Sequence, residues 1–149
     1  MANDASVTMT ATVLPDEIAK AISGTITVSP ADADDKWYYK LTSVSNSSTD
    51  LIAGYFTDYT AVDDDTAPTA VDAADKVKFL FIKNTDTAND IHFVIDAGTA
   101  STSVSDGIKV TAGNSVTLEL PNTTVAAIHA ISSTSTVNCL VAALIEDVA

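Results

Sequence analysis

Two runs of aspartates are the first candidates for chemistry, because carboxylate oxygens are the ligands that Ca²⁺ prefers. The first run lies within residues 32–35 and the second is 63–65. An EF-hand loop that began at Asp32 would need glycine at its sixth position and glutamate at its twelfth, where this chain has Trp37 and Ser43. The EF-hand pattern therefore fails. A cation site of another kind stays open, beside the simpler interpretation that both runs are solvated acidic turns.

Two histidines and one cysteine are the other candidate ligands or nucleophiles. His92 and His129 each lie among apolar residues in a strand-like segment, and a metal site would need carboxylate partners that the sequence does not place. Cys139 lies in the apolar run 137–141 without a neighbouring base, so we expect a buried, unreactive thiol. A single cysteine also excludes an intrachain disulfide. The histidines are expected at the surface or at an interface.

Motifs of known enzyme classes are missing from the sequence. There is no Gly-x-Ser-x-Gly nucleophile elbow and no glycine-rich phosphate loop. A carboxylate pair suited to glycoside hydrolysis stays open, because its members could be distant in sequence. Residues 46–48 and 122–124 match the glycosylation acceptor pattern, but the first residues lack the basic and apolar regions of a signal peptide. We therefore predict a protein without enzymatic activity, cofactor or metal, synthesised in the cytoplasm.

The charge of the chain narrows its possible partners. Seven basic residues against twenty acidic ones give a net charge of −13. A protein that binds nucleic acid needs a basic patch for the phosphates, and an anionic membrane repels acidic surfaces, so both partners are disfavoured. No apolar run reaches the roughly 18 residues of a membrane span. A partner with a basic surface, or bound cations, is favoured instead.

The elements that must position these residues are mostly short strands, because apolar side chains recur at every second position. Strands are predicted at 7–14, 25–29, 36–44, 51–60, 77–82, 91–95, 116–120, 128–131 and 137–141. Val77, Phe79 and Phe81 are expected on one face of their strand. Proline followed by two acids predicts one short helix over 15–22. The pattern predicts an all-β fold, an antiparallel, jelly-roll-like β-sandwich in a single domain over 1–149, with an N-terminal arm at 1–6 and a mobile acidic loop at 62–75.

The order of motifs in the second half resembles that of a known class of proteins. The segments are Lys78-Phe-Leu-Phe-Ile-Lys-Asn-Thr85, then 91–99, 108–120 and 127–132, followed by a closing apolar strand. This order is similar to that of small structural proteins of tailed bacteriophages, most of all capsid decoration proteins. The resemblance implies a protein on the capsid surface of the virion that binds the major capsid protein, stabilises the lattice and forms a homotrimer.

Contacts with such a lattice would need exposed apolar and aromatic side chains, which protein interfaces favour. We expect strand addition at a free sheet edge or at the N-terminal arm to contribute main-chain hydrogen bonds. For several of the aromatic residues, ordinary core packing is an equal alternative. The candidate contact residues are Trp37, Tyr38, Tyr39, Tyr55, Tyr59, Leu140 and Leu144.

Three other functions remain open at this stage. The chain could be a different phage component, from a tail, neck or fibre. It could also be an adhesive β-sandwich that stacks its aromatic side chains on carbohydrate. An enzyme with an unrecognised site is the third, and the sequence favours it least.

Overall fold

The computed structural model describes residues 4–13, 20–57, 69–105 and 107–148. Contacts within the chain divide it into two compact units, Met1–Asp32 and Ala33–Ala149. The expectation of a single domain over residues 1–149 is therefore corrected to two units. The first unit is too short to build a layered core of its own, which explains why the sequence did not distinguish it.

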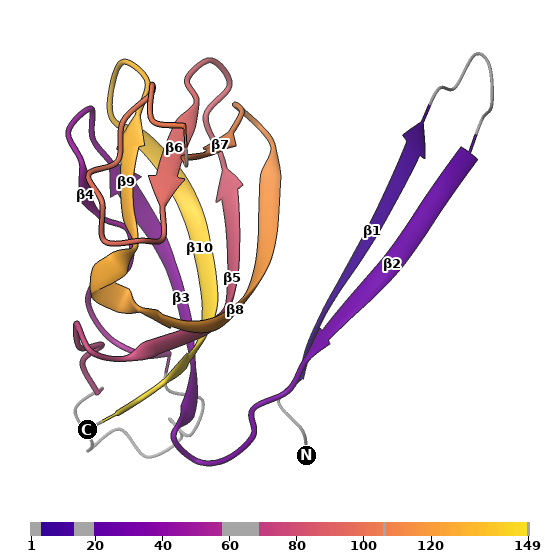
Figure 1. Ribbon diagram of the computed structural model, residues 1–149, viewed down its shortest axis with the longest axis vertical. Helices are drawn as coiled ribbons and strands as arrows, with labels where there is room; N and C mark the ends of the chain where they lie inside the picture. The colour runs from indigo at the N-terminus through magenta and orange to yellow at the C-terminus, as the bar shows by residue number, and fades with distance from the viewer. Residues whose placement is uncertain (1–3, 14–19, 58–68, 106, 149) are drawn as a thin grey trace. The chain divides into compact units, whose positions relative to one another are not determined.

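The first unit is a long antiparallel ribbon of two strands, β1 (Ala5–Val13) and β2 (Lys20–Val28) (Figure 1). Nine residue pairs join them, from Ala5 opposite Val28 to Val13 opposite Lys20. The predicted helix over 15–22 is wrong where it can be checked, because residues 20–22 belong to β2, and 15–19 lie outside the described residues. Residues 5 and 6 of the predicted arm likewise form the start of β1. Cross-strand pairing over the whole ribbon has overridden the local helical spacing.

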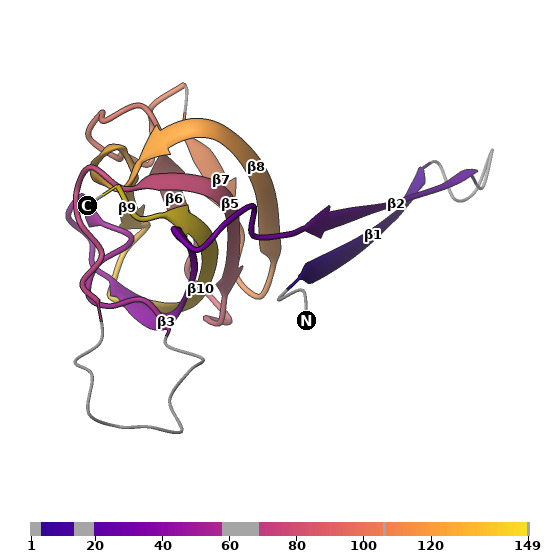
Figure 2. The same cartoon turned by 90° about the horizontal axis from the view of Figure 1, so that it is seen from below.

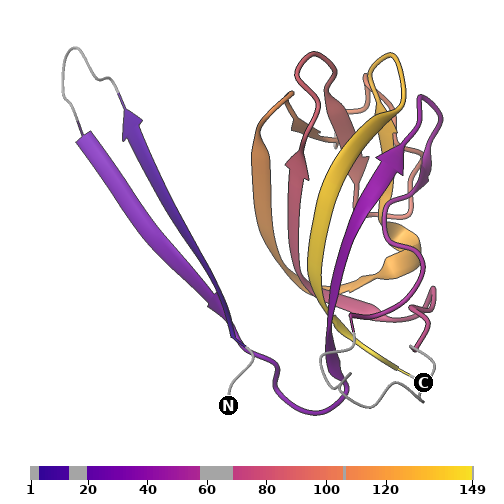
Figure 3. The same ribbon diagram turned by 180° about the vertical axis from the view of Figure 1, so that it is seen from behind.

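The second unit contains two four-stranded sheets, and all strand pairs in them are antiparallel. One sheet has the order β3-β10-β5-β8, and the other has the order β4-β9-β6-β7. Figures 1 and 3 show the first of these sheets from opposite sides. The strands are β3 (Asp35–Val44), β4 (Thr49–Asp50), β5 (Lys76–Asn84), β6 (Ile91–Val94), β7 (Ile108–Val110), β8 (Ser115–Thr124), β9 (His129–Ser132) and β10 (Val137–Glu146). The predicted all-β, antiparallel class is confirmed.

Helical structure in the described residues is limited to one 3-10 turn, η1 (Val125–Ala127), between β8 and β9. The strand predicted over 51–60 is wrong for its described part. Residues 51–57 form bends, with only an isolated bridge from Tyr55 to Ala70, while the neighbouring strand β4 spans two residues. Leu51 and Ile52 are both buried, so this segment is anchored by side chains that point inward at consecutive positions. A regular strand cannot direct consecutive side chains to the same side.

Side chains from both sheets meet in one hydrophobic core. In Figure 2, the strands of the two sheets surround this common interior. Phe93 on β6 has no exposed surface, and Tyr38 on β3 is almost as deeply buried. The core also contains Val44, Leu51, Ile52, Val77, Leu80, Ile82, Ile91, Ile128, Val137, Cys139, Val141 and Ile145. Cys139 is therefore buried, and burial raises the pKa of its thiol to about 12.

A break in the strand register changes which side chains of β5 face the core. The pairing of β5 with β8 shifts between Val77 and Phe79. Val77 therefore joins the core with Leu80 and Ile82, whereas Phe79 is buried but lies outside that cluster. The expectation that Val77, Phe79 and Phe81 share one face is wrong. A β-bulge changes the phase of the alternation, and the periodicity of a single strand does not reveal it.

The segment that follows the undescribed residues 58–68 is not a uniformly exposed acidic loop. Ala70 pairs with Tyr55, and the carboxylate of Asp75 is buried. That carboxylate accepts hydrogen bonds from the backbone N–H of Asp72 at 2.8 Å and of Val148 at 3.1 Å. The mobile loop predicted over 62–75 is corrected for Asp75, whose carboxylate is buried and held by the backbone N–H groups of Asp72 and Val148. Residues 62–68 lie outside the described part.

Candidate functional site

The outward side of the sheet β3-β10-β5-β8 carries a cluster of apolar side chains that is not part of the core. We call it the outer face and define it by Tyr39, Leu41, Leu140, Ala142 and Phe81. Strand register places them in two rows: Leu41 lies opposite Leu140, and Tyr39 opposite Ala142, which in turn pairs with Phe81. The alternate residues on the same strands, such as Tyr38 and Ala143, belong to the core. The outer face thus follows directly from the two-residue period of a strand.

Two members of the outer face are unusually exposed for their size. Tyr39 is 59% exposed and Leu41 is 57% exposed, while Leu140, Ala142 and Phe81 are half-buried. Apolar side chains that are clustered on neighbouring strands, and not scattered singly, are characteristic of binding surfaces. None of the five carries a charge, although the whole chain is strongly acidic.

An aromatic contact rigidifies one end of the outer face. Trp37 is the next outward residue on β3, and its ring meets the ring of Phe79 edge-on, with centroids 6.4 Å apart and planes at 80°. Leu144 pairs with both residues in the register and is buried. Edge-to-face aromatic pairs add a modest stabilisation beyond burial. Trp37 and Leu144 therefore pack at one end of the outer face, whereas Tyr39 and Leu41 contribute its exposed side chains.

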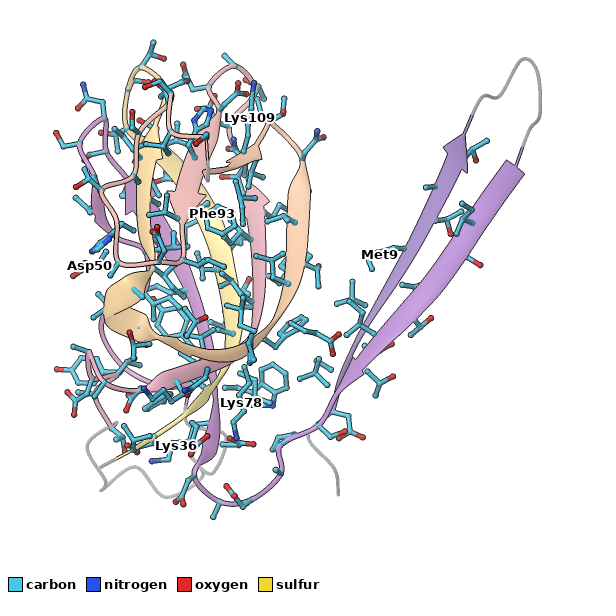
Figure 4. The ribbon with its side chains drawn as sticks, viewed as in Figure 1. Met9, Lys36, Asp50, Lys78, Phe93 and Lys109 are labelled. Carbon is cyan, nitrogen blue, oxygen red and sulfur yellow. The ribbon has the colours of Figure 1, made fainter. Side chains whose placement is uncertain are left out.

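The rim beside this end is charged. Lys78 forms ion pairs with Asp35 at 2.7 Å and with Glu146 at 2.9 Å, and Lys36 forms one with Asp147. Figure 4 shows Lys36 and Lys78 near the same end of the sheet. The hydrogen bonds from Lys78 to Asp35, and then to Glu146, raise the pKa of the Lys78 ammonium. These groups are satisfied by one another, which suits a polar border better than proton transfer.

The edge of the sheet at β3 is partly covered. The backbone N–H of Thr57 donates to the carbonyl of Trp37 at 2.8 Å. The ammonium of Lys40 donates to the carbonyl of Ala53, also at 2.8 Å. The first contact occupies a main-chain group of β3 that another strand could pair with, and the second holds the segment around Ala53 beside this edge. The outer face is therefore better suited to docking by its side chains than β3 is to strand addition.

The candidate ligands for chemistry lie apart from one another. His129 Nδ1 is 2.8 Å from the carbonyl of Gly98, and its Nε2 is 3.3 Å from Asp50. His92 lies on β6, and its Nδ1 is buried without a hydrogen-bond partner within the described residues. In the parts of the chain that the structure covers, no three His, Cys, Asp or Glu side chains are grouped closely enough to hold a metal ion. The acidic run 63–65 lies outside the described residues.

The burial of His92 predicts a pH-dependent stability. Desolvation, followed by the charge of Lys109, lowers the pKa of His92 below its ordinary 6.5. A histidine with a depressed pKa in the folded state binds fewer protons there than in the unfolded chain. Stability should therefore fall as the pH drops below about 6.5. Replacing His92→Gln should flatten this part of the curve in urea unfolding measured from pH 8 to pH 5.

The titration of Asp86 and Asp90 does not change the stability of the fold in that pH window. Hydrogen bonds hold the pKa values of Asp86 and Asp90 below 3.8, the first through the backbone N–H of Ala88 and the second through Lys109. The stability that they contribute is present above their ordinary pKa and is lost only in stronger acid. An unchanged slope between pH 8 and pH 5 in the His92 variant would contradict the assignment.

The structure separates the predicted contact residues into three groups. Tyr39 and Leu140 lie on the outer face, and Trp37 lies at its end. Tyr38 is buried, with its hydroxyl donating to the carbonyl of Ala53 at 3.2 Å, and Leu144 is buried as well, so neither presents a surface. Tyr55 is 61% exposed but belongs to the segment after β4. Tyr59 lies outside the described residues.

Three members of the outer face were not among the predicted contact residues: Leu41, Ala142 and Phe81. Leu41 follows Tyr39 at a spacing of two, which was a usable signal. Ala142 and Phe81 become neighbours of Tyr39 only through the strand order β3-β10-β5. That order joins segments about 40 to 100 residues apart, and the sequence pattern contains no signal for it.

Comparisons with known proteins return no match to a protein-family model, to a curated protein or to a solved structure. Within the described residues, no helix has the length and apolarity that a membrane crossing requires.

Proposed function

We propose that the protein is a non-enzymatic structural component that docks on a larger assembly through the outer face. The observation that carries the proposal is the pair Tyr39 and Leu41, exposed side by side on a regular sheet with a charged border. An apolar centre with a polar rim is the usual composition of a protein interface. The two four-stranded sheets with one shared core support the finer description of the second unit as a β-sandwich of the jelly-roll kind.

The assembly that we propose is the capsid of a tailed phage, which the protein decorates and stabilises by binding the major capsid protein as a homotrimer. The support is the resemblance of the strand and turn motifs in residues 78–132 and the absence of enzyme motifs from the sequence. A virion-surface location agrees with the charge of −13, which keeps free copies dispersed until they meet a complementary surface. Each copy binds weakly, but many copies bound to one capsid together stabilise it strongly.

Binding to carbohydrate is less consistent with the outer face. Stacking on a sugar ring would need polar side chains beside the aromatic ring to bind the hydroxyl groups. Tyr39 is flanked instead by Leu41 and Ala142. A tail, neck or fibre position fits the same surface chemistry as a capsid position, and electron microscopy of labelled particles would distinguish them.

Co-sedimentation with purified capsids tests the proposal. Replacing Tyr39→Thr and Leu41→Thr together removes two exposed apolar groups, keeps residues that favour strands and leaves the net charge unchanged. If both side chains are buried on docking, each contributes about 1.5–3 kcal/mol, so binding should weaken by about a hundredfold or more. Tyr55→Thr is the matched control, because Tyr55 is equally exposed elsewhere and its removal should leave binding intact. Wild-type protein that stays out of the particle fraction would reject the proposal.

A further inference from the structure

The ribbon formed by β1 and β2 has one apolar face and one hydroxyl-bearing face. In the register, Val7 lies opposite Ile26, and Thr8 lies opposite Thr25 with their hydroxyl oxygens 3.5 Å apart. The polar face consists of Ser6, Thr8, Thr10, Thr12, Ser23, Thr25 and Thr27, with Ala21. The register also places the end pair Val13 and Lys20 on the other face. The apolar remainder of that face, which we call the ribbon face, consists of Ala5, Val7, Met9, Ala11, Ile22, Gly24, Ile26 and Val28.

The ribbon cannot bury this face by itself. The first unit contains only two strands among its described residues, and a two-stranded ribbon has no second layer to pack against. Met9 is 46% exposed and Ile22 is 65% exposed. Figure 4 shows the side chain of Met9 projecting from β1.

The centre of the ribbon face combines a protruding side chain with a notch. Met9 and Gly24 form the fifth of nine residue pairs, so they lie at the midpoint of both strands. A Cβ atom added to Gly24 would meet nothing within 4 Å, and its backbone is not in the left-handed region. Neither crowding nor backbone conformation within the chain therefore requires glycine there, although glycine weakens a strand. The missing side chain leaves a space directly beside Met9, the longest side chain of the ribbon face.

We propose that a second copy of this chain covers the ribbon face with its own ribbon face. A two-fold axis along the length of the ribbon would set Met9 of each copy against Gly24 of the other. The same axis sets Ala11 against Ile22 and Ala5 against Val28, so a small side chain meets a larger one in both of these contacts. It also sets Val7 against Ile26, two branched apolar side chains. An axis across the ribbon would instead set Met9 against Met9 and leave the two glycines facing an empty space. Self-complementarity of this kind is what a two-fold interface requires.

The contact area of the ribbon and the net charge of the whole chain determine how strong this pairing is. Nine residue pairs span about 30 Å by about 10 Å, so each copy contributes on the order of 300 Å² of sheet area. Stable protein interfaces bury about 800 Å² on each partner. The pairing is therefore weak between free molecules and gains strength where many copies are held close together. Each chain carries a charge of −13, so two copies repel each other, and added salt should strengthen the pairing by screening this repulsion. Binding of a basic partner to the ribbon would instead become weaker as salt is added.

Sedimentation of the full chain tests the pairing, with protein concentrations up to about 1 mM, where contacts of millimolar dissociation constant become populated. Replacing Gly24→Leu fills the notch and should weaken association about tenfold or more, because overpacked contacts are strongly disfavoured. The double variant Met9→Gly with Gly24→Met exchanges knob and notch and should restore association. Ser23→Val is the matched control on the opposite face and should leave the mass distribution unchanged.

The outcomes are separable. Salt-strengthened association that Gly24→Leu abolishes and the exchange variant restores supports the pairing of ribbon faces. Association that Gly24→Leu leaves as strong as in the wild type would mean that the copies do not pair through the ribbon face, and it overturns the proposal. A mass that stays the same across all concentrations, in wild type and Gly24→Leu alike, also overturns it, because the face is then covered within one molecule or by a different partner. The inference depends on the ribbon residues alone, so loss of capsid binding by the outer-face variants would not affect it.

Discussion

Replacing Phe93→Ala is expected to lower the free energy of unfolding of the second unit by about 3–5 kcal/mol. Phe93 has no exposed surface and lies on β6 between its two pairing partners, Ala130 on β9 and Ile108 on β7. The loss combines the transfer free energy of the ring with the cost of the cavity that it leaves. A domain of this kind has a total stability of about 5–15 kcal/mol, so the variant should unfold at markedly lower urea concentration.

Phe81→Ala is the matched control for this measurement. Phe81 is half-buried on the outer face of the neighbouring sheet and is not part of the core. The same change of side chain there leaves no closed cavity, so its cost should be clearly smaller. Equal losses for the two variants would contradict the assignment of Phe93 to the centre of the core.

A comparable loss is expected from Asn84→Asp, although the two side chains have nearly the same shape. Asn84 is completely buried at the end of β5. Its amide nitrogen donates to the carbonyls of Asn89 at 2.9 Å and Val110 at 3.2 Å, while its oxygen accepts from the backbone N–H of Asp86 at 3.0 Å. A carboxylate would set a second oxygen against both carbonyls. An uncompensated buried charge typically costs about 3–5 kcal/mol.

The pH dependence of this variant identifies the cause. Burial without a cation raises the pKa of an introduced carboxyl in the folded state above its unfolded value of about 3.9. The loss of stability should therefore grow as the pH rises from about 4 towards 7. Urea unfolding of the variant and of Asn46→Asp, an exposed control, measures the difference at both pH values. A loss of stability that is the same at pH 4 and pH 7 would indicate a packing defect and not a buried charge.

Much of the fold could be predicted because most strands can be recognised from the alternation of apolar residues within their own segments. The two-residue period at 36–44, 77–82, 91–95, 116–120 and 137–141 corresponds to β3, β5, β6, β8 and β10. The two-residue period did not predict the structure correctly where pairing between distant segments determined it. Residues 20–22 have helical spacing but pair with residues 11–13 in the ribbon. In β5, the β-bulge between Val77 and Phe79 places Val77 on the opposite face from the one that simple alternation with Phe79 predicts.

The candidate site was only partly predictable for the same reason. Tyr38 and Tyr39 are adjacent aromatic residues, and the strand period requires that they point to opposite sides without stating which side is covered. That choice depends on the second sheet, which supplies Ile91 and Phe93 to the core. The buried role of Asn84 was equally hidden, because its partners in the turn and on β7 are defined only by the folded chain.

Hydroxyl-radical footprinting of the chain, free and bound to purified capsids, tests most directly whether the outer face is the docking surface. Oxidation of Tyr39 and Leu41 should fall sharply on binding, since both are more than half exposed in the free protein. Tyr55, which is 61% exposed on another segment, should be oxidised equally in both states. Unchanged oxidation of Tyr39 and Leu41 in the bound protein would contradict the assignment and direct the search to a different surface.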